Sequence, residues 1–216
     1  INAHGGVDVL VNNAGRSIRR SLALSQERFH DYQRTMQLNY FGALKLVFGF
    51  LPGMRTQRFG HIVNVSSIGV QTHPPRFSAY VASKAALDAF SRVAASELFE
   101  DGVRITTVYM PLVRTEMIAP TTIYKAFPTI SAGQAAELIC GAFVGRDKRV
   151  ATPLGVMGEL AYAAAPELVD RLLAQAYKLF PDSAAARGKG DPRPAEEPAL
   201  STRAVAFAHL VPGVHW

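Results

Sequence analysis

Short apolar runs that end in small polar residues alternate with long helical stretches, and this alternation constrains the fold more than any other feature. Three such runs occupy residues 7–11 (VDVLV), 61–65 (HIVNV) and 104–108 (RITTV). Runs of this length between turn residues are typical of strands buried on both faces. Strands separated by helices of more than about a dozen residues form parallel βαβ units. The pattern therefore predicts an α/β fold with a doubly wound parallel sheet.

The expected helices have recognisable starts. Ser131 and Gln134 have the spacing of a capping box, in which each side chain bonds the backbone of the other residue. A short last strand is expected near Val150. The helical periodicity predicts helices over residues 25–52, 78–98, from 131 through 143, and 167–179.

Composition excludes several classes of protein. The formal net charge of +6 comes from scattered Lys and Arg residues rather than a basic run, so we expect no nucleic-acid partner and explain the charge by a phosphate-bearing ligand. Cys140 is the only cysteine, which excludes an intrachain disulfide and favours the cytoplasm. The six histidines lack metal-site spacing, so we expect no metal. No apolar run reaches the roughly 18 residues of a membrane span, although peripheral membrane contact stays open.

Tyr80 and Lys84 lie four residues apart within the second expected helix, so both side chains share one face. A phenol titrates near ~10, and acid–base work at neutral pH needs a lower pKa. A neighbouring ammonium lowers the pKa of a phenol, whereas burial raises it. We expect the charge to win where a second positive charge, such as that of a bound ligand, is also present. By itself the pair is common on surface helices.

Polar residues also follow each predicted strand. Asn12, Ser67 and Pro111 stand at or just after three strand ends, and Ser67 precedes Tyr80 by 13 residues. Ligands of open parallel sheets bind at the carboxyl ends of the strands, so these residues should converge on one site. Gly15 would let the backbone approach a ligand closely.

In combination, these residues resemble the short-chain dehydrogenase/reductase family. The resemblance covers about residues 7–152, and it would make the fold Rossmann-like. It rests on ordered motifs: NNAG at 12–15, Asn39 within LNYFGA, GHIVNVSS at 60–67, YVASK at 80–84 and PLVRTEM at 111–117.

The resemblance implies roles for individual residues. Tyr80 would be the general acid/base, Ser67 would polarise the substrate carbonyl, and Lys84 would hold the nicotinamide ribose and lower the tyrosine pKa. Asn39 would anchor a water in the proton relay. The implied cofactor is NADP or NAD, with NADPH favoured by the resemblance alone, and its contacts would be Tyr80, Lys84, Asn12, Ala14, Gly15, Pro111, Val113 and Thr115.

The sequence departs from the family pattern in two places. The glycine-rich phosphate loop and the strands that precede NNAG in the family are lacking here, so we expect a piece of a longer protein with a further upstream domain. Leu112 stands where the family usually has glycine.

A narrower resemblance links the chain to the carboxy-terminal dehydrogenase domain of bacterial long-chain fatty acyl-coenzyme A reductases. It rests on residues 110–128, on FPDS at 180–183 and on GVHW at 213–216. It implies an apolar carbonyl or acyl substrate. Five residues would suit an apolar lid over that substrate, or equally a core-packing segment: Met117, Ile118, Ile123, Tyr124 and Phe127.

These observations give one organisation and three candidate functions. Residues 1–181 would be the C-terminal portion of a Rossmann-type dehydrogenase domain, 182–203 a polar Pro/Gly/Ala-rich linker, and 204–216 an apolar tail. The alanine-rich face of the Tyr80 helix favours a homo-oligomer. The leading function is reduction of a fatty acyl or fatty aldehyde carbonyl. The alternatives are a 3-oxoacyl or ketone reductase and a catalytically silent docking module.

Overall fold

A four-stranded parallel sheet organises the computed structural model, which describes residues 6–116, 118, 122–188, 200–209 and 211. The strands are β1 (Val9–Asn12), β2 (Gly60–Val65), β3 (Val103–Val108) and β4 (Arg149–Val150), and their order in the sheet is β1-β2-β3-β4. All neighbouring pairs are parallel. The predicted α/β class is confirmed, with β1 displaced two residues beyond the predicted start so that it ends at Asn12.

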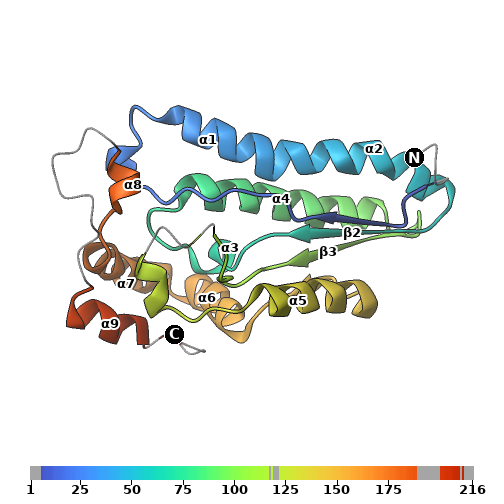
Figure 1. The fold of residues 1–216 in the computed structure, drawn as a ribbon. Coiled ribbons are helices and arrows are strands. Elements are labelled where there is room, and N and C mark those ends of the chain that lie inside the picture. Colours follow the sequence, from blue (N-terminus) through green and yellow to red (C-terminus); the bar gives the residue numbers. More distant parts are fainter. Residues whose placement is uncertain (1–5, 117, 119–121, 189–199, 210, 212–216) are drawn as a thin grey trace.

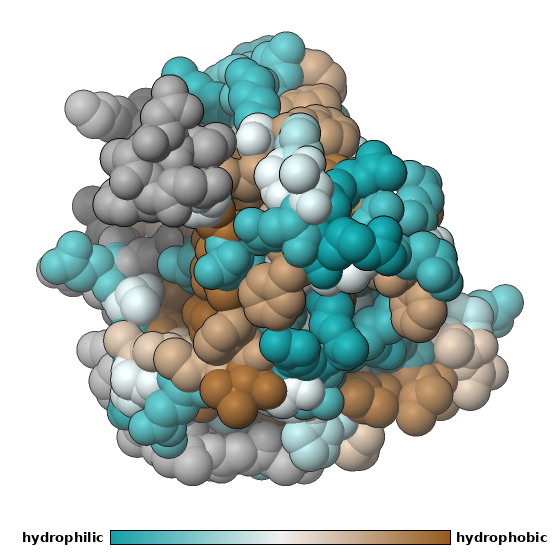
Figure 2. All heavy atoms as spheres, turned by 90° about the vertical axis from the view of Figure 1, so that its right-hand side faces the viewer, coloured by the Kyte–Doolittle hydropathy of each residue, from teal (hydrophilic) through white to brown (hydrophobic). Residues whose placement is uncertain are grey.

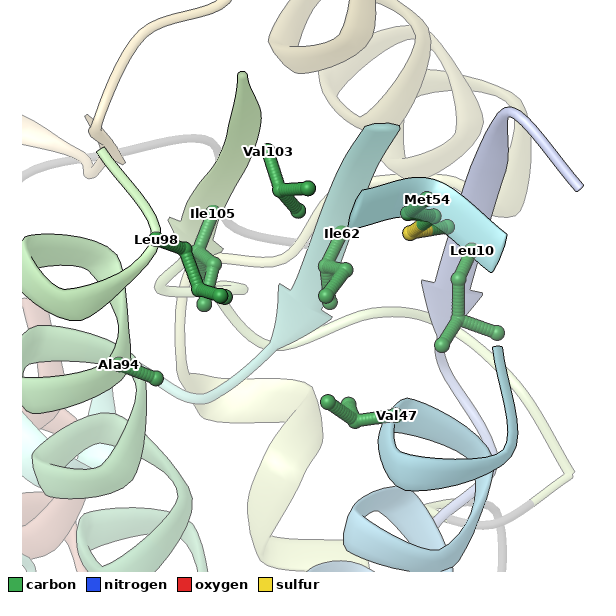
Figure 3. Close-up of a cluster of buried hydrophobic side chains, with 8 residues drawn as sticks. All are labelled: Leu10, Val47, Met54, Ile62, Ala94, Leu98, Val103 and Ile105. Carbon is green, nitrogen blue, oxygen red and sulfur yellow. The ribbon is translucent and has the colours of Figure 1, made fainter. Parts of the chain in front are cut away.

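Helices cover both faces of this sheet (Figure 1). On one face lie α2 (Ala43–Thr56) and α4 (Ser78–Glu97), and on the other lies α5 (Ala132–Gly145). Figure 3 shows the core beneath α2 and α4, where side chains from three strands meet the helices. This cluster comprises Leu10, Val47, Met54, Ile62, Ala94, Leu98, Val103 and Ile105. Beneath α5 the smaller core consists of Val63, Val108 and Ala142. Burial on both faces explains why the strands are nearly continuous apolar runs.

The first long helix differs from its prediction at both ends and in the middle. A 3₁₀ turn, η1 (Leu22–Leu24), precedes α1 (Phe29–Met36), and a π-helical turn, η2 (Gln37–Gly42), joins α1 to α2. Pro52 lies inside α2 rather than at its end. Pro52 has no backbone N–H to donate to the carbonyl of Phe48, four residues earlier. Because Pro52 and Phe48 are both exposed, this carbonyl lies on the solvent side and the helix continues.

The second half of the chain adds shorter elements. The predicted capping box is present, since Gln134 N donates to Ser131 Oγ and Ser131 N donates to Gln134 Oε1. The remaining elements are α3 (Gly69–Thr72), η3 (Thr122–Ala126), α6 (Pro153–Ala164), α7 (Pro166–Leu179), α8 (Ala184–Arg187) and α9 (Thr202–His209).

The predicted linker and tail lie only partly within the described residues. Residues 189–199, 210 and 212–216 are outside them. The start of the linker forms α8, and α9 packs against α7 and η3. The boundaries of the three predicted segments therefore stay a prediction.

The strands give the molecule two different ends. In Figure 1 the strand arrows point toward the side where α7, α8 and α9 gather. Figure 2 shows the opposite side, where hydrophilic and hydrophobic residues are mixed across the middle of the face. The carboxyl ends of the strands, where the sequence predicts the site, therefore lie on the side covered by the C-terminal helices.

Candidate active site

The predicted strand-end residues meet at one edge of the sheet. β2 and β3 stay paired beyond their last strand residues, because Ser66 N donates to Val108 O at 2.8 Å and Ile68 N donates to Met110 O at 2.9 Å. This pairing brings Ser67, which follows β2, beside the segment that leads into Pro111. Asn12 ends the neighbouring strand β1.

Ser67 and Tyr80 are brought together, although 13 residues separate them in the sequence. The Ser67 hydroxyl lies close enough to the Tyr80 phenol to lower its pKa. The Oγ of Ser67 also accepts a bond from Gly69 N at 3.0 Å, at the start of α3. Burial raises the pKa of the Tyr80 phenol, and the Ser67 hydroxyl opposes that rise. Burial is the larger of the two influences, so the pKa of Tyr80 in this chain lies above its ordinary value.

Lys84 lies one helical turn from Tyr80 and is buried, with 4% of its surface exposed. Its Nζ donates to Val65 O, the last residue of β2, at 2.6 Å. Burial lowers the pKa of this ammonium to about 8. An ammonium has three donors, so the carbonyl satisfies one of them and two can serve a ligand.

Asn39 is held in the π-helical turn η2. Its Nδ2 donates to Arg16 O at 2.9 Å and to Ser83 Oγ at 2.9 Å, and its Oδ1 accepts from Arg16 N at 2.9 Å. The extra residue of a π turn re-aims a side chain, and such turns are frequent at functional sites. Asn39 therefore ties the segment after NNAG to α4, a connection that the sequence pattern alone did not predict.

Gly15 leaves space beside the ammonium. A Cβ added there would lie 3.3 Å from Lys84 Nζ and 3.3 Å from Asn39 Oδ1. Both distances are tight for a real side chain. The glycine thus keeps the surface next to two predicted site residues open, as expected for a backbone that a ligand approaches closely.

The Asn12 side chain points into the protein. Its Nδ2 donates to Asn64 Oδ1 at 2.8 Å, and Asn64 Nδ2 donates to Ser91 Oγ at 2.8 Å. Sequence reasoning missed Asn64, Ser83 and Gly69, which orient predicted site residues. Asn64 is a polar residue in the middle of an apolar strand, and that irregularity was the available signal.

The other predicted cofactor contacts differ in their exposure. Pro111 and Val113 are half-buried, whereas Ala14 and Thr115 are exposed. Residues 112–114 are braced by Ile130, whose N donates to Leu112 O at 2.9 Å and whose O accepts from Arg114 N at 2.9 Å.

The predicted apolar lid divides into two parts. Ile123 is buried with Phe180, Ala204 and Ala208, and Phe127 packs against the same cluster, as in the core-packing alternative. Tyr124 packs against this cluster too, but it also reaches toward Tyr80 through Phe77. Its ring lies 6.5 Å from that of Phe77, and the Phe77 ring lies 6.4 Å from that of Tyr80. Ile118 is half-buried, and Met117 lies outside the described residues.

No described helix combines the length and hydropathy that crossing a bilayer requires. Within the same residues, no group of three or more His, Cys, Asp or Glu side chains could hold a metal ion.

The fold and this arrangement define a member of an oxidoreductase family. The short chain dehydrogenase family profile matches residues 1–124. A fatty acyl-CoA reductase of Acinetobacter baylyi is 53% identical over 210 residues, which cover 97% of this chain and 69% of that protein. The chain belongs to the short-chain dehydrogenase/reductase family.

Two further comparisons place the chain within that family. An uncharacterised oxidoreductase of Mycobacterium tuberculosis is 54% identical over 212 residues, covering 98% of this chain and 62% of the relative. The chain thus spans less than two thirds of the length of this relative. A short-chain dehydrogenase from Burkholderia cenocepacia, solved in complex with NADP, superimposes with a TM-score of 0.69 at 25% identity, covering 80% of this chain and 70% of that one.

Proposed function

We propose that the full-length protein reduces the carbonyl of a fatty acyl or fatty aldehyde substrate with a nicotinamide cofactor. The observation that carries the proposal is the buried ammonium of Lys84, held at the end of β2 by Val65 O, one helical turn from Tyr80, whose phenol the Ser67 hydroxyl influences. The similar reductase of Acinetobacter baylyi supports the substrate class.

The residues of this chain suit proton transfer to a carbonyl oxygen. Ser67 donates a hydrogen bond to that oxygen, and Tyr80 delivers the proton that converts it to a hydroxyl. The phenolate left on Tyr80 is stabilised by the nearby positive charge of Lys84. Asn39 keeps the segment around Arg16 in place and anchors a water that returns a proton. When bound, the nicotinamide supplies the hydride to the carbonyl carbon.

The surroundings of Lys84 and Gly15 fit such a cofactor. Lys84 has donors beyond the one that Val65 O accepts, and Gly15 leaves the neighbouring surface open. Lys84 and Gly15, with Tyr80 and Asn39 beside them, would hold the ribose next to the nicotinamide. Ala14, Pro111, Val113 and Thr115 complete the proposed contacts, with Asn12 acting through its backbone because its side chain bonds Asn64. NADP is favoured over NAD by the NADP-bound neighbour.

Replacement of Tyr80 by Phe in the full-length protein tests the proposal. Cofactor oxidation with a fatty aldehyde should fall by at least about a hundredfold, because the proton donor is lost. Tyr32→Phe is the matched control: the Tyr32 hydroxyl bonds Ser78 Oγ of α4 at 2.7 Å, but it is not among the proposed site residues. Equal activity of both variants would contradict the role of Tyr80.

A substrate panel separates the alternatives. Turnover of β-keto esters but not fatty aldehydes or acyl-thioesters would indicate a 3-oxoacyl or ketone reductase. No turnover of any of them by the full-length protein would favour a docking module.

The remaining assignments are part of the same proposal. We place the protein in the cytoplasm, with an upstream domain and with the segment boundaries predicted above. A homo-oligomer would form through α4, where Ala82 and Ala89 are exposed and Ala85 and Ala86 half-buried. Light scattering of the wild-type protein and of Ala89→Glu tests this contact, which the variant should weaken.

A further inference from the structure

Two segments flank the candidate site and bond one another. Residues 16–21 follow the NNAG turn, and their first residue is bound by Asn39 through its backbone. Residues 74–77 precede Tyr80 and carry Phe77, whose ring faces the Tyr80 ring. Arg20 N donates to Arg76 O at 2.7 Å, which joins the two segments.

Three arginines of these segments bind the backbone of the C-terminal region. Arg19 Nη2 donates to Phe180 O at 3.0 Å and to Pro181 O at 2.8 Å. Arg20 Nε donates to Ala186 O at 2.9 Å. Arg76 Nη1 donates to Tyr177 O at 2.9 Å, and its guanidinium lies 3.9 Å from the centre of the Tyr177 ring. We call residues 177–187 the clamped segment.

Asp182 connects the clamped segment to both flanking segments at once. Its Oδ1 accepts from Ser21 N at 2.9 Å and lies 3.3 Å from Arg76 Nε in an ion pair. Both side chains of the pair are largely buried, with exposures of 6% for Arg76 and 15% for Asp182. Arg76 also has a left-handed backbone, with φ +73°, which is uncommon for a residue with a side chain. The contacts with Asp182 and Tyr177 hold it in that conformation.

The clamped segment also supports η3. Phe180 lies in the cluster that buries Ile123 and Ala126 of η3 against Ala204 and Ala208 of α9. From the same turn, Tyr124 reaches the Phe77 ring. The rings of Tyr124 and Phe77 therefore form an aromatic wall that leads to Tyr80. The clamped segment fixes the position of Tyr124 through η3, and Arg76 fixes the position of the neighbouring Phe77.

We infer that Asp182 is a positioning residue that sets this aromatic wall and thereby the preference for long apolar substrates. The inference rests on the proposed function. Phe77 and Tyr124 are both half-buried, so part of each side chain can contact an acyl chain, whereas the reacting carbonyl needs only Ser67 and Tyr80. Loosening the wall should therefore weaken the binding of a long chain and leave a short aldehyde unaffected.

Asp182→Asn tests the inference in the full-length protein, because the amide keeps an acceptor for Ser21 N and removes the charge that pairs Arg76. We expect the KM for dodecanal to rise about tenfold, with kcat within about twofold and with butanal kinetics unchanged. Hydrogen exchange of residues 177–187 should become faster. Asp170→Asn, an exposed acid of α7, is the control and should change neither measurement.

Arg19→Ala provides a milder test that keeps the Asp182–Arg76 pair, and it should shift the dodecanal KM in the same direction. An equal loss of activity on both aldehydes, or unchanged hydrogen exchange in the clamped segment, would overturn the inference. If the wild-type protein reduces neither aldehyde nor a fatty acyl-thioester, the proposed function fails and the inferred substrate preference falls with it. If the wild-type protein reduces both aldehydes but the variants do not change the dodecanal KM more than the butanal KM, only the inference is refuted.

Discussion

The Nζ of Lys84 lies 2.6 Å from the carbonyl oxygen of Val65, so the helix that carries the candidate acid–base pair is bonded to the carboxyl end of the central strand β2. This bond fixes the position of the ammonium relative to Ser67, two residues further along. It also requires burial of a positive charge, which is unfavourable for folding. The buried ammonium of Lys84 thus lowers the stability of the fold, which favours a role for it in the site.

Lys84→Met should stabilise the protein at neutral pH. The folded-state pKa of Lys84, about 8, lies below the ordinary value of 10.5, so between these pH values the folded state releases a proton that the unfolded chain retains. The destabilisation is fully present below pH about 8 and disappears as pH rises toward 10.5. The stability advantage of the variant should therefore shrink by about 2 kcal/mol between pH 7 and pH 10. Urea unfolding of both proteins at the two pH values measures it, and a constant difference would contradict the assigned pKa.

The same ionisation should limit catalysis. The kcat/KM for the reduced cofactor reports groups of the free enzyme and should decrease above pH about 8, as Lys84 loses the charge that holds the ribose. Lys84→Arg keeps the charge at all these pH values, so its residual activity should show no such decrease. A decrease at the same pH in both proteins would assign it to another group.

Gly15→Ala should weaken cofactor binding without unfolding the protein. The new Cβ would press on Lys84 Nζ and Asn39 Oδ1, each 3.3 Å away. We expect the cofactor KM to rise severalfold and the Tm to change little. Gly49→Ala is a matched control, because nothing lies within 4 Å of its added Cβ. That variant should leave kinetics unchanged and add roughly 0.5–1 kcal/mol of stability through helix propensity.

Asn39→Asp should be more damaging than its shape suggests. The two bonds donated by Nδ2, to Arg16 O and Ser83 Oγ, would be lost, and a buried carboxylate would face the Arg16 carbonyl oxygen. We expect about 2–4 kcal/mol of lost stability and at least about a tenfold fall in kcat/KM. Thermal unfolding and steady-state kinetics measure both effects. Wild-type stability would mean that η2 does not depend on these bonds.

Local patterns in the sequence determined the class of fold and the central pair of the site. Apolar runs alternating with helical stretches predict parallel strands whatever packs around them, and Tyr80 and Lys84 share a face because a helix repeats every 3.6 residues. The position of Ser67 followed from the same logic, since a residue just after a parallel strand lies at its carboxyl end. Such features depend only on neighbours within a few residues.

Only the tertiary structure decided which way individual side chains point and what the C-terminal region contacts. Asn12 stands at the predicted strand end, yet its side chain bonds Asn64 inside the protein. The π turn at Asn39 and the core between η3 and α9 follow no period in the sequence. The bond from Arg20 to Ala186 spans 166 residues. Contacts over such separations leave no local signal, because their energy depends on how whole helices and strands pack rather than on the spacing of residues along one of them.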